Sequence, residues 1–393
     1  MSDQADIVII GGGIVGCSVA YALTRRGVRN VLLLERRAIA SGPTGASAGI
    51  LSRCYQHPTL VAMAEHGRDF YARCEAHTGR SADFVRSGWL LIGGEAQAPH
   101  PRTAWSLQRA AGLSCAWLSP ADIKTLEPRI EVEEDAVALY LEDAGYADPY
   151  SAAHALAGAA REAGAAIAEH TEVAGIETDG QGVCGVRTRT GTIATRTVVN
   201  AAGSWADRIG NMVGVTLPIE TSRHQLVGLR RPSSFGPGHP VIADPANMVY
   251  LRPEGRDITI VGSNDPKEAR NLVDPDRCPV GADPEAALVQ WQRACARMPA
   301  LAGAGMVRGW SGVYDISPDG FPIVDGPLGP QGFYCVTGLS GRGFKFAPAI
   351  GRIVASLILD SSPDPWAEMF RLGRFDAGVT IPAGVFWGGT RQA

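Results

Sequence analysis

The hydrophobic positions near the start of the chain form two short apolar runs, with a glycine-rich turn and a helical stretch between them. Residues 6–10 and 31–34 consist mainly of isoleucine, valine and leucine, which is typical of strands buried on both faces of a parallel sheet. Residues 15–26 have the pattern of a helix, and Gly27 is well placed to end it. The order of strand, turn, helix and strand predicts the first unit of a parallel sheet.

Further helices and strands follow along the chain. Helices are predicted over 60–77, 150–163 and 285–298, and from a first turn containing Pro348 to about residue 359. Strands are predicted over 88–93, 167–177, 248–252, 258–261 and 332–337, and from residue 197 onward. The alternation in 248–252 would place Met248, Tyr250 and Arg252 on one face of their strand. Residues 218–315 are mostly predicted strands and turns, which indicates a sheet-rich region.

The turn after the first apolar run carries a G-x-G-x-x-G motif on Gly11, Gly13 and Gly16. In such a motif the first glycine permits a tight turn, the second lets the backbone approach a pyrophosphate, and the third allows close packing of helix on strand. The helix N-terminus supplies N–H groups to the phosphates. Glu35 ends the second apolar run and is placed to accept a hydrogen bond from a ribose 2′-OH. The pattern predicts binding of an adenosine dinucleotide, and the motif alone does not separate NAD from FAD.

Three other glycine-rich loops favour the larger cofactor. Residues 42–49 are small, so the backbone can pass close to a ligand. Residues 197–205 again form a buried strand that ends in small residues before a helix start, and residues 338–343 form another glycine loop before a helix. A chain that bound only NAD would not need the second strand and turn, so these loops favour a flavin dinucleotide.

These elements predict an α/β fold with a discontinuous Rossmann-like FAD-binding domain and an α+β substrate domain built on a mainly antiparallel sheet. The predicted segments are 1–85, 150–217 and 316–365 for the FAD-binding domain, 86–149 and 218–315 for the substrate-binding domain, and 366–393 for a C-terminal extension.

Composition and charge narrow the classes of function. A chain of 393 residues with 45% hydrophobic residues can bury about two domain cores, and its 48 glycines fit a protein whose backbone approaches a ligand closely. The net charge of −4 argues against a nucleic-acid partner. The eight cysteines lack metal-binding spacing, so we expect no metal site. We expect the cysteines to be reduced thiols. Glycines interrupt the apolar stretch 7–24, so we expect no membrane segment and a cytoplasmic protein.

Five motifs together resemble the D-amino-acid oxidase superfamily of flavoproteins, and most closely its sarcosine oxidase branch, over nearly the whole chain. They are glycines 11–16 with Glu35, and residues 87–93, 200–205, 317–320 and 338–346. The last of them, GLSGRGFKF, closely resembles the stretch that carries a substrate-binding lysine in monomeric sarcosine oxidases. Residues 240–262 also resemble the β subunit of heterotetrameric sarcosine oxidases.

The resemblance implies FAD-dependent oxidation of the C–N bond of a secondary or tertiary amino acid, giving an imine that water hydrolyses. Two alternatives stay open: oxidation of a D-amino acid or another amine in a biosynthetic route, and a non-catalytic subunit that holds FAD. The implied partners are a small amine or amino-acid substrate and either oxygen or another electron acceptor. A homo-oligomer or a partner subunit also stays open.

The resemblance points to four candidate residues around the substrate. Lys345, between two phenylalanines, matches the carboxylate anchor. Tyr250 would line the pocket or bind the carboxylate, although a half-buried sheet tyrosine is the simpler reading. Arg53 lies one residue from the position of the arginine that clamps the carboxylate in monomeric enzymes, and His224 is a candidate base or a structural histidine. Tyr314 stands where glycine oxidases and D-amino-acid oxidases hold the carboxylate with arginine, which disfavours primary amino acids.

The candidate cofactor-binding residues follow the same loops. They are Gly11, Gly13, Ile14, Val15, Gly16, Glu35, Arg36, Gly42, Thr44, Ala46, Ser47, Ala48, Gly49, Val173, Ala201, Ala202, Gly203, Trp205, Gly312, Gly341, Arg342, Gly343, Phe344 and Lys345. The cysteine that links the flavin in monomeric sarcosine oxidases would fall near Ser311 or Gly312. The histidine that links it in dimethylglycine dehydrogenases would fall near Ala46. Neither linking residue is present, so we expect non-covalent FAD. Ile260 stands where sarcosine oxidases carry a lysine that promotes oxygen activation, which predicts slower reaction with oxygen.

Overall fold

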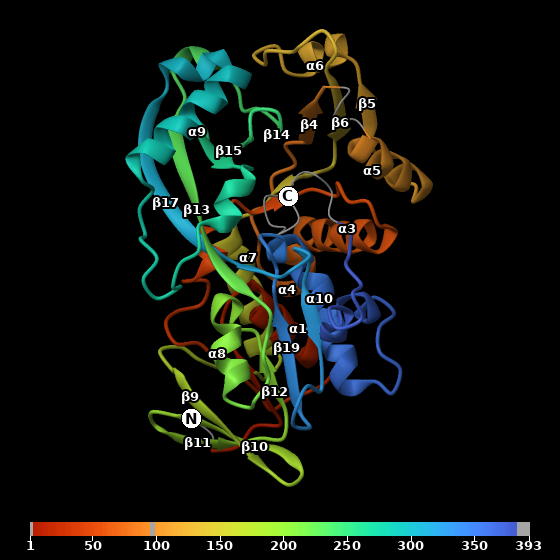
Figure 1. The fold of residues 1–393 in the computed structure, drawn as a ribbon, viewed down its shortest axis with the longest axis vertical. Helices are drawn as coiled ribbons and strands as arrows, with labels where there is room; N and C mark the ends of the chain where they lie inside the picture. Colours follow the sequence, from red (N-terminus) through yellow and green to blue (C-terminus); the bar gives the residue numbers. More distant parts are fainter. Residues whose placement is uncertain (1–2, 95–98, 383–393) are drawn as a thin grey trace.

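A computed structural model describes residues 3–94 and 99–382 of the chain (Figure 1). A six-stranded sheet forms its lower half in this view, in the order β18-β19-β12-β1-β2-β8. The strands are β1 (Ile7–Ile10), β2 (Val31–Leu34), β8 (Ala166–Ala168), β12 (Val198–Asn200), β18 (Ile323–Asp325) and β19 (Phe333–Thr337). Neighbouring strands are parallel except β18, which runs antiparallel to β19. Three distant parts of the sequence therefore build one sheet around the N-terminal strand.

Helices surround this sheet. They are α1 (Ile14–Arg25), α3 (Pro58–Ala72), α4 (Cys74–Thr78), α7 (Pro149–Glu162), α8 (Ala206–Asn211) and α10 (Gly343–Leu359). All of them bury the larger hydrophobic core except α8, which belongs to a second core. Helix α1 packs against both α7 and α10. Its approach to α10 is close, because a Cβ on Gly351 would lie 2.6 Å from the backbone oxygen of Ser18.

The second large sheet has eight strands in the order β17-β13-β16-β15-β14-β4-β6-β5 and occupies the upper half of Figure 1. Its strands are β4 (Trp89–Gly93), β5 (Ala116–Leu118), β6 (Val137–Leu141), β13 (Glu220–Arg230), β14 (Val241–Asp244), β15 (Val249–Glu254), β16 (Ile258–Ser263) and β17 (Gly305–Ile316). All pairs are antiparallel except β14 with β4. The two sheets together confirm the predicted α/β fold class with a mainly antiparallel second sheet.

The remaining elements are short or cover the second sheet. Helix α9 (Pro284–Arg297) packs on β13, β15 and β16. The others are α2 (Pro43–Ala46), α5 (Pro99–Ala110), α6 (Pro120–Leu126), the pair β3 (Ile50–Leu51) and β7 (Gly145–Tyr146), and the three-stranded sheet of β9 (Val173–Asp179), β10 (Gly182–Thr188) and β11 (Gly191–Ala194). The 3-10 helices are η2 (Gly203–Trp205), η3 (Ser233–Phe235), η4 (Pro266–Arg270), η5 (Pro299–Gly303), η6 (Ala367–Phe370) and η7 (Leu372–Arg374).

Helix α10 begins at Gly343, so Pro348 lies in its interior and not in its first turn as expected. A proline cannot donate the hydrogen bond that the carbonyl four residues earlier would accept. That carbonyl belongs to Phe344, and the Tyr71 hydroxyl of α3 donates to it at 2.8 Å. The helix therefore starts at Gly343 and carries Lys345 in its first turn.

Three smaller differences concern the edges of elements. The helix predicted over 60–77 divides at Arg73 into α3 and α4. Met248 precedes β15 with φ of 53°, so it does not share a strand face with Tyr250. Of the predicted C-terminal extension, residues 383–393 lie outside the described residues, and Arg374 in the described part forms an ion pair with Asp319 at 2.8 Å.

Candidate active site

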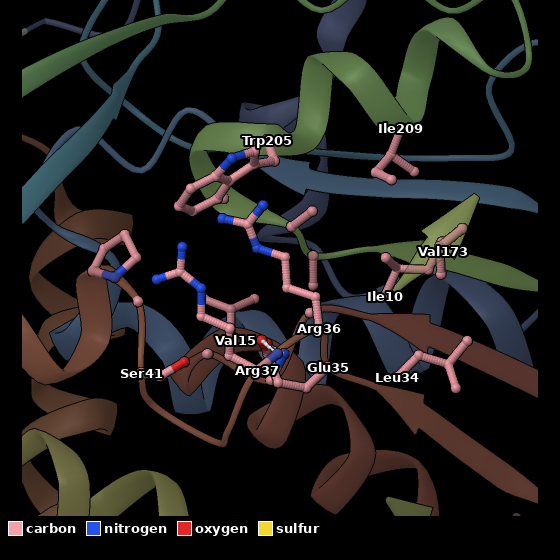
Figure 2. Close-up of a pocket in the computed structure, with 18 of the residues that line it drawn as sticks. Ile10, Val15, Leu34, Glu35, Arg36, Arg37, Ser41, Val173, Trp205 and Ile209 are labelled. Atoms are coloured by element: carbon pink, nitrogen blue, oxygen red, sulfur yellow. Dashed lines mark hydrogen bonds between the residues drawn. The ribbon is translucent and has the colours of Figure 1, made fainter. Parts of the chain in front are cut away.

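A pocket opens at the carboxyl ends of β1, β2 and β12, where the predicted dinucleotide motif lies (Figure 2). The predicted residues that line it are Gly11, Gly13, Ile14, Val15, Glu35, Arg36, Gly42, Thr44, Val173, Ala201, Ala202, Gly203 and Trp205. Gly12 of the glycine turn also lines it. The lining residues that the sequence did not single out are Ile10, Leu34, Arg37, Ser41, Pro43, Thr171, Glu172, Arg208, Ile209, Met212, Asp276, Asp315 and Leu339. Several of these flank a predicted residue, so extending each motif by one position would have found them. Arg208 and Asp276 carried no sequence signal.

The glycine turn has no room for side chains. Gly11 has φ of 113°, and a Cβ there would lie 2.4 Å from the backbone oxygen of Ala201. A Cβ on Gly16 would lie 1.9 Å from the backbone oxygen of Gly11, which is the close helix–strand packing expected of the third glycine. At Gly13 it would lie 3.2 Å from the Thr44 hydroxyl, which accepts a hydrogen bond from the Ile14 amide at 2.9 Å. This cradle fits a pyrophosphate at the start of α1.

Glu35 is held at the edge of the same turn. One carboxylate oxygen accepts a hydrogen bond from the Gly12 amide at 2.7 Å, and the other accepts one from the Arg37 amide at 2.7 Å. Figure 2 shows Glu35 beside Val15, and Arg36 extending from the end of β2 toward Trp205. Because the backbone fixes the carboxylate at the end of β2, Glu35 fits the role of ribose acceptor. The residues present are therefore compatible with an adenosine dinucleotide.

The other predicted cofactor residues do not line this pocket: Gly16, Ala46, Ser47, Ala48, Gly49, Gly312, Gly341, Arg342, Gly343, Phe344 and Lys345. Strand β17 brings part of this set together. Its Trp310 indole donates to the Ala46 carbonyl at 3.0 Å, and a Cβ on Gly312 would lie 2.9 Å from the Ala46 Cβ. Tyr314 of β17 packs so closely on Gly341 that a Cβ there would lie 2.5 Å from its ring.

Asp315 joins β17 to the loop before α10. Its carboxylate accepts hydrogen bonds from the Thr337 hydroxyl at 3.2 Å and from the Leu339 amide at 3.1 Å. Burial raises the pKa of this carboxyl, and the hydrogen bonds oppose that shift. Asp315 also lines the dinucleotide pocket. The loop that leads to Lys345 is thus fixed at the inner end of that pocket.

Lys345 is buried in the first turn of α10, with 3% of its surface exposed. On one side Phe344 stacks on Tyr71 with ring centroids 4.7 Å apart, and on the other Phe346 packs on Tyr55 at 5.2 Å. Burial and, to a smaller degree, the positive charge of Arg342 lower the pKa of Lys345 to about 7, and Cys54 acts in the opposite direction. The side chain of Lys345 is therefore buried between two aromatic pairs.

Cys54, which influences the pKa of Lys345, also lines a small cavity beside the eight-stranded sheet. The cavity is lined by Ile50, Ser52, Cys54, Trp89, Leu91, Ala243, Tyr250 and Asn264. Tyr250 lies flat against Gly262 of β16, where a Cβ would be 2.1 Å from the ring, so only glycine fits there. Burial raises the pKa of Tyr250 well above its usual value, which keeps the hydroxyl protonated. The structure thus brings Tyr250 and the surroundings of Lys345 to one cavity.

His224 lies on β13 beside Tyr314, with ring centroids 3.8 Å apart. Its Nε2 is 2.9 Å from the Ser222 hydroxyl, and its Nδ1 is 3.2 Å from a carboxylate oxygen of Glu268 in η4. Both ring nitrogens therefore lie close to polar protein atoms, which supports the structural alternative for His224 over the role of a base. The geometry instead suits a residue that holds Tyr314 in place. No sequence signal pointed to Glu268, because its turn is joined to β13 only in the folded chain.

Arg53 is fully buried away from this cavity. Its guanidinium donates to Glu65 at 2.8 Å, Asp143 at 2.7 Å, Gln108 at 3.2 Å and the carbonyl of Ser114 at 3.0 Å. All three of its nitrogens are used in this network between α3, α5 and the turn after β6. The expectation that Arg53 clamps a substrate carboxylate therefore does not match the structure, because protein groups already bind its guanidinium.

Residues 3–94 and 99–382 contain neither a membrane-spanning helix nor a cluster of metal ligands. No helix there is long and apolar enough to cross a membrane. No group of three His, Cys, Asp or Glu side chains there could hold a metal ion.

Comparison with known proteins agrees with this site. Residues 6–357 match the model of a family described as FAD dependent oxidoreductase. Human mitochondrial sarcosine dehydrogenase is 31% identical over 396 residues, covering 97% of this chain and 42% of its own length. A 4-methylaminobutanoate oxidase (formaldehyde-forming) of Paenarthrobacter nicotinovorans is 30% identical over 361 residues, covering 91% of this chain and 44% of its own. The chain thus spans less than half the length of these two relatives.

Among solved structures, an L-proline dehydrogenase from P. horikoshii superposes with a TM-score of 0.89 at 27% identity, covering 97% of this chain and 100% of that one. The family match spans both large sheets and the glycine turn, and it confirms the resemblance carried by the sequence motifs. The chain belongs to this family of FAD-dependent oxidoreductases, and FAD is its cofactor.

Proposed function

We propose that the chain oxidises the C–N bond of an N-substituted amino acid, with non-covalently bound FAD as the electron acceptor. The observation that supports this most is the deep burial of Lys345 in the first turn of α10, near enough to Cys54 for that residue to influence its pKa, because Cys54 lines the same small cavity as Tyr250. In so apolar a setting, a charged ammonium attracts a substrate carboxylate more strongly than it would in water. Relatives named for sarcosine, dimethylglycine and 4-methylaminobutanoate support an N-methylated substrate.

The residues that would hold FAD are those of the cradle and of β17. Gly11 and Gly13 would admit the pyrophosphate, and Glu35 would accept from the ribose. Ala46, Gly312 and Gly341, which β17 brings together, would border the flavin ring. FAD supplies the oxidising chemistry when bound, by accepting a hydride from the carbon next to the substrate nitrogen.

The chain's own residues bind and orient the substrate. Lys345 would bind the carboxylate, which fixes one end of the amino acid relative to the reacting carbon. The Tyr250 ring closes the cavity on the sheet side and excludes water, and its protonated hydroxyl is available as a hydrogen-bond donor. Tyr314 would take part as a wall residue, held by stacking on His224.

Anaerobic mixing of the FAD-loaded protein with a panel of amines tests the proposal. N-methyl amino acids should bleach the visible flavin band, and the matched N-methyl amines that lack a carboxylate should not. Equal bleaching by D-amino acids would favour the alternative substrate class. If no amine bleaches the flavin, the chain holds FAD without catalysing amine oxidation.

Carboxylate binding should depend on pH through Lys345. Its pKa of about 7 means that the ammonium is charged below pH 7 and loses its proton above it. The affinity for an unreactive carboxylate such as propionate, which stays ionised above pH 6, should fall about tenfold per pH unit above pH 7. Titration of the flavin absorption spectrum with propionate between pH 6 and 9 measures this. A pH-independent affinity in that range would contradict the assignment.

Reaction with oxygen should be slow. Ile260 is buried in an apolar cluster with Ala48, Leu226 and Tyr250, so no cation stands at this position to stabilise the negative charge that develops on oxygen. We expect the reduced protein to react with air no faster than free reduced FAD, and to pass electrons readily to an artificial acceptor. Stopped-flow reoxidation in air measures this. Fast reoxidation with stoichiometric peroxide would show that the chain is an oxidase.

A further inference from the structure

Asp276 places a carboxylate at the mouth of the dinucleotide pocket. It belongs to the segment between η4 and α9, which reaches across from the eight-stranded sheet. One of its oxygens accepts hydrogen bonds from the Arg36 guanidinium at 2.9 Å and from the Trp205 indole at 2.9 Å. The other accepts from the Arg208 guanidinium. A single side chain thus contacts three residues of the pocket lining.

These three residues lie on opposite sides of the pocket. Arg36 follows β2, whereas Trp205 ends η2 and Arg208 lies in α8. The Arg36 guanidinium also lies over the Trp205 ring, 4.1 Å from its centre, and Figure 2 shows the two side chains meeting above Val15. Contacts to Asp276 therefore join the two walls to a segment of the other sheet.

The turn that carries Asp276 is itself ordered by Asp274. The Asp274 carboxylate accepts from the backbone amide of Asp276 at 3.0 Å and forms an ion pair with Arg208 at 2.7 Å. Partial burial acts to raise the pKa of Asp276, but hydrogen bonds from Arg208, Arg36 and Trp205 lower it to about 2. The carboxylate is therefore charged at every pH at which the protein would work.

We propose that Asp276 is a clasp that retains FAD by tying Arg36, Trp205 and Arg208 together across the mouth of the pocket. Separation of the two walls, or lifting of the segment around Asp276, would break these contacts, so either movement is opposed by them. Single exposed ion pairs contribute little, but a network that joins three segments is lost as a unit. The clasp concerns cofactor retention and does not depend on which amine the protein oxidises.

The rate of FAD release tests the clasp directly. FAD-loaded protein is diluted, and release is followed by the rise in flavin fluorescence. Asp276→Asn should accelerate release about five- to tenfold at low salt, because it removes the charge that holds both arginines. Wild-type release should accelerate with added sodium chloride, and release from the variant should respond less. An unchanged or slower release from Asp276→Asn would overturn the proposal.

Two further variants make the result specific. Asp274→Asn is the matched control: its amide oxygen can still accept the hydrogen bond from the Asp276 backbone amide, so it keeps the turn and removes only a charge next to Arg208, and release should change by less than about twofold. Trp205→Phe removes only the indole donor and should accelerate release to an intermediate degree, which keeps the test valid if Asp276→Asn folds poorly. Equal acceleration by Asp274→Asn and Asp276→Asn would show a general charge effect and would also overturn the clasp.

Discussion

Replacing Lys345 by methionine should lower kcat/KM for an N-methyl amino acid by about 30- to 5000-fold, which corresponds to about 2–5 kcal/mol of transition-state stabilisation. Methionine has a similar length and apolar character, so the packing of Phe344 on Tyr71 and of Phe346 on Tyr55 should persist. The variant therefore removes the positive charge and keeps the aromatic packing on both sides of it. Steady-state kinetics with an artificial electron acceptor measure the effect.

Two controls separate loss of the carboxylate contact from general damage. Lys267→Met changes an exposed lysine of η4 in the same way and should leave kcat/KM unchanged. An N-methyl amine without a carboxylate should react equally slowly with the wild type and with Lys345→Met. The visible spectrum of bound FAD shows whether the cofactor site survives. If kcat/KM for the amino acid is unchanged by Lys345→Met, the lysine is not the anchor.

Replacing Gly11 by alanine should abolish tight FAD binding and lower the free energy of unfolding by about 3 kcal/mol or more. Two causes act together at this position. The backbone has φ of 113°, which side-chain-bearing residues rarely adopt, and the new Cβ would lie 2.4 Å from the Ala201 carbonyl of the neighbouring strand. Relief of the clash must move the turn that faces the pyrophosphate. Fluorescence titration with FAD and urea unfolding of the apoprotein measure the two effects.

Gly27→Ala provides the matched comparison. Gly27 has φ of 89° at the end of α1, but a Cβ there would meet nothing within 4 Å. Its substitution reports backbone strain alone, about 1–2 kcal/mol, and should leave FAD affinity as it is. The expectation for Gly11 fails if Gly11→Ala costs no more than Gly27→Ala and binds FAD with wild-type affinity.

The cofactor end of the molecule could be predicted from the sequence because its signals are local. Gly11, Gly13 and Glu35 lie within one strand–helix–strand unit, so spacing along the chain translates directly into position in space. The glycine turn and the residue after β2 therefore came to one pocket as expected. The loop before α10, which the sequence also marks with glycines on both sides of Arg342, contributes only Leu339 to that pocket.

The substrate end was less predictable because its residues are decided by distant partners. Arg53 and Lys345 are both cations in apolar surroundings, and nothing local distinguishes them. The Arg53 guanidinium donates hydrogen bonds to Glu65, Gln108 and Asp143, which come from three separate parts of the chain. Lys345 lies in the first turn of α10, where Cys54 influences its pKa. Only the assembled fold shows that Arg53 is taken up by a protein network.

Tyr71 supplies from α3 the hydrogen bond that Pro348 cannot donate within α10. The first turn of α10, which carries Lys345, is therefore held partly by a neighbouring helix and not by its own ladder alone. Gly67 of α3 adds to this, because it permits backbone contact with Lys345 itself. Substitutions along α3 can thus shift the backbone of Lys345, so the position of the proposed carboxylate anchor depends on two helices from opposite ends of the chain.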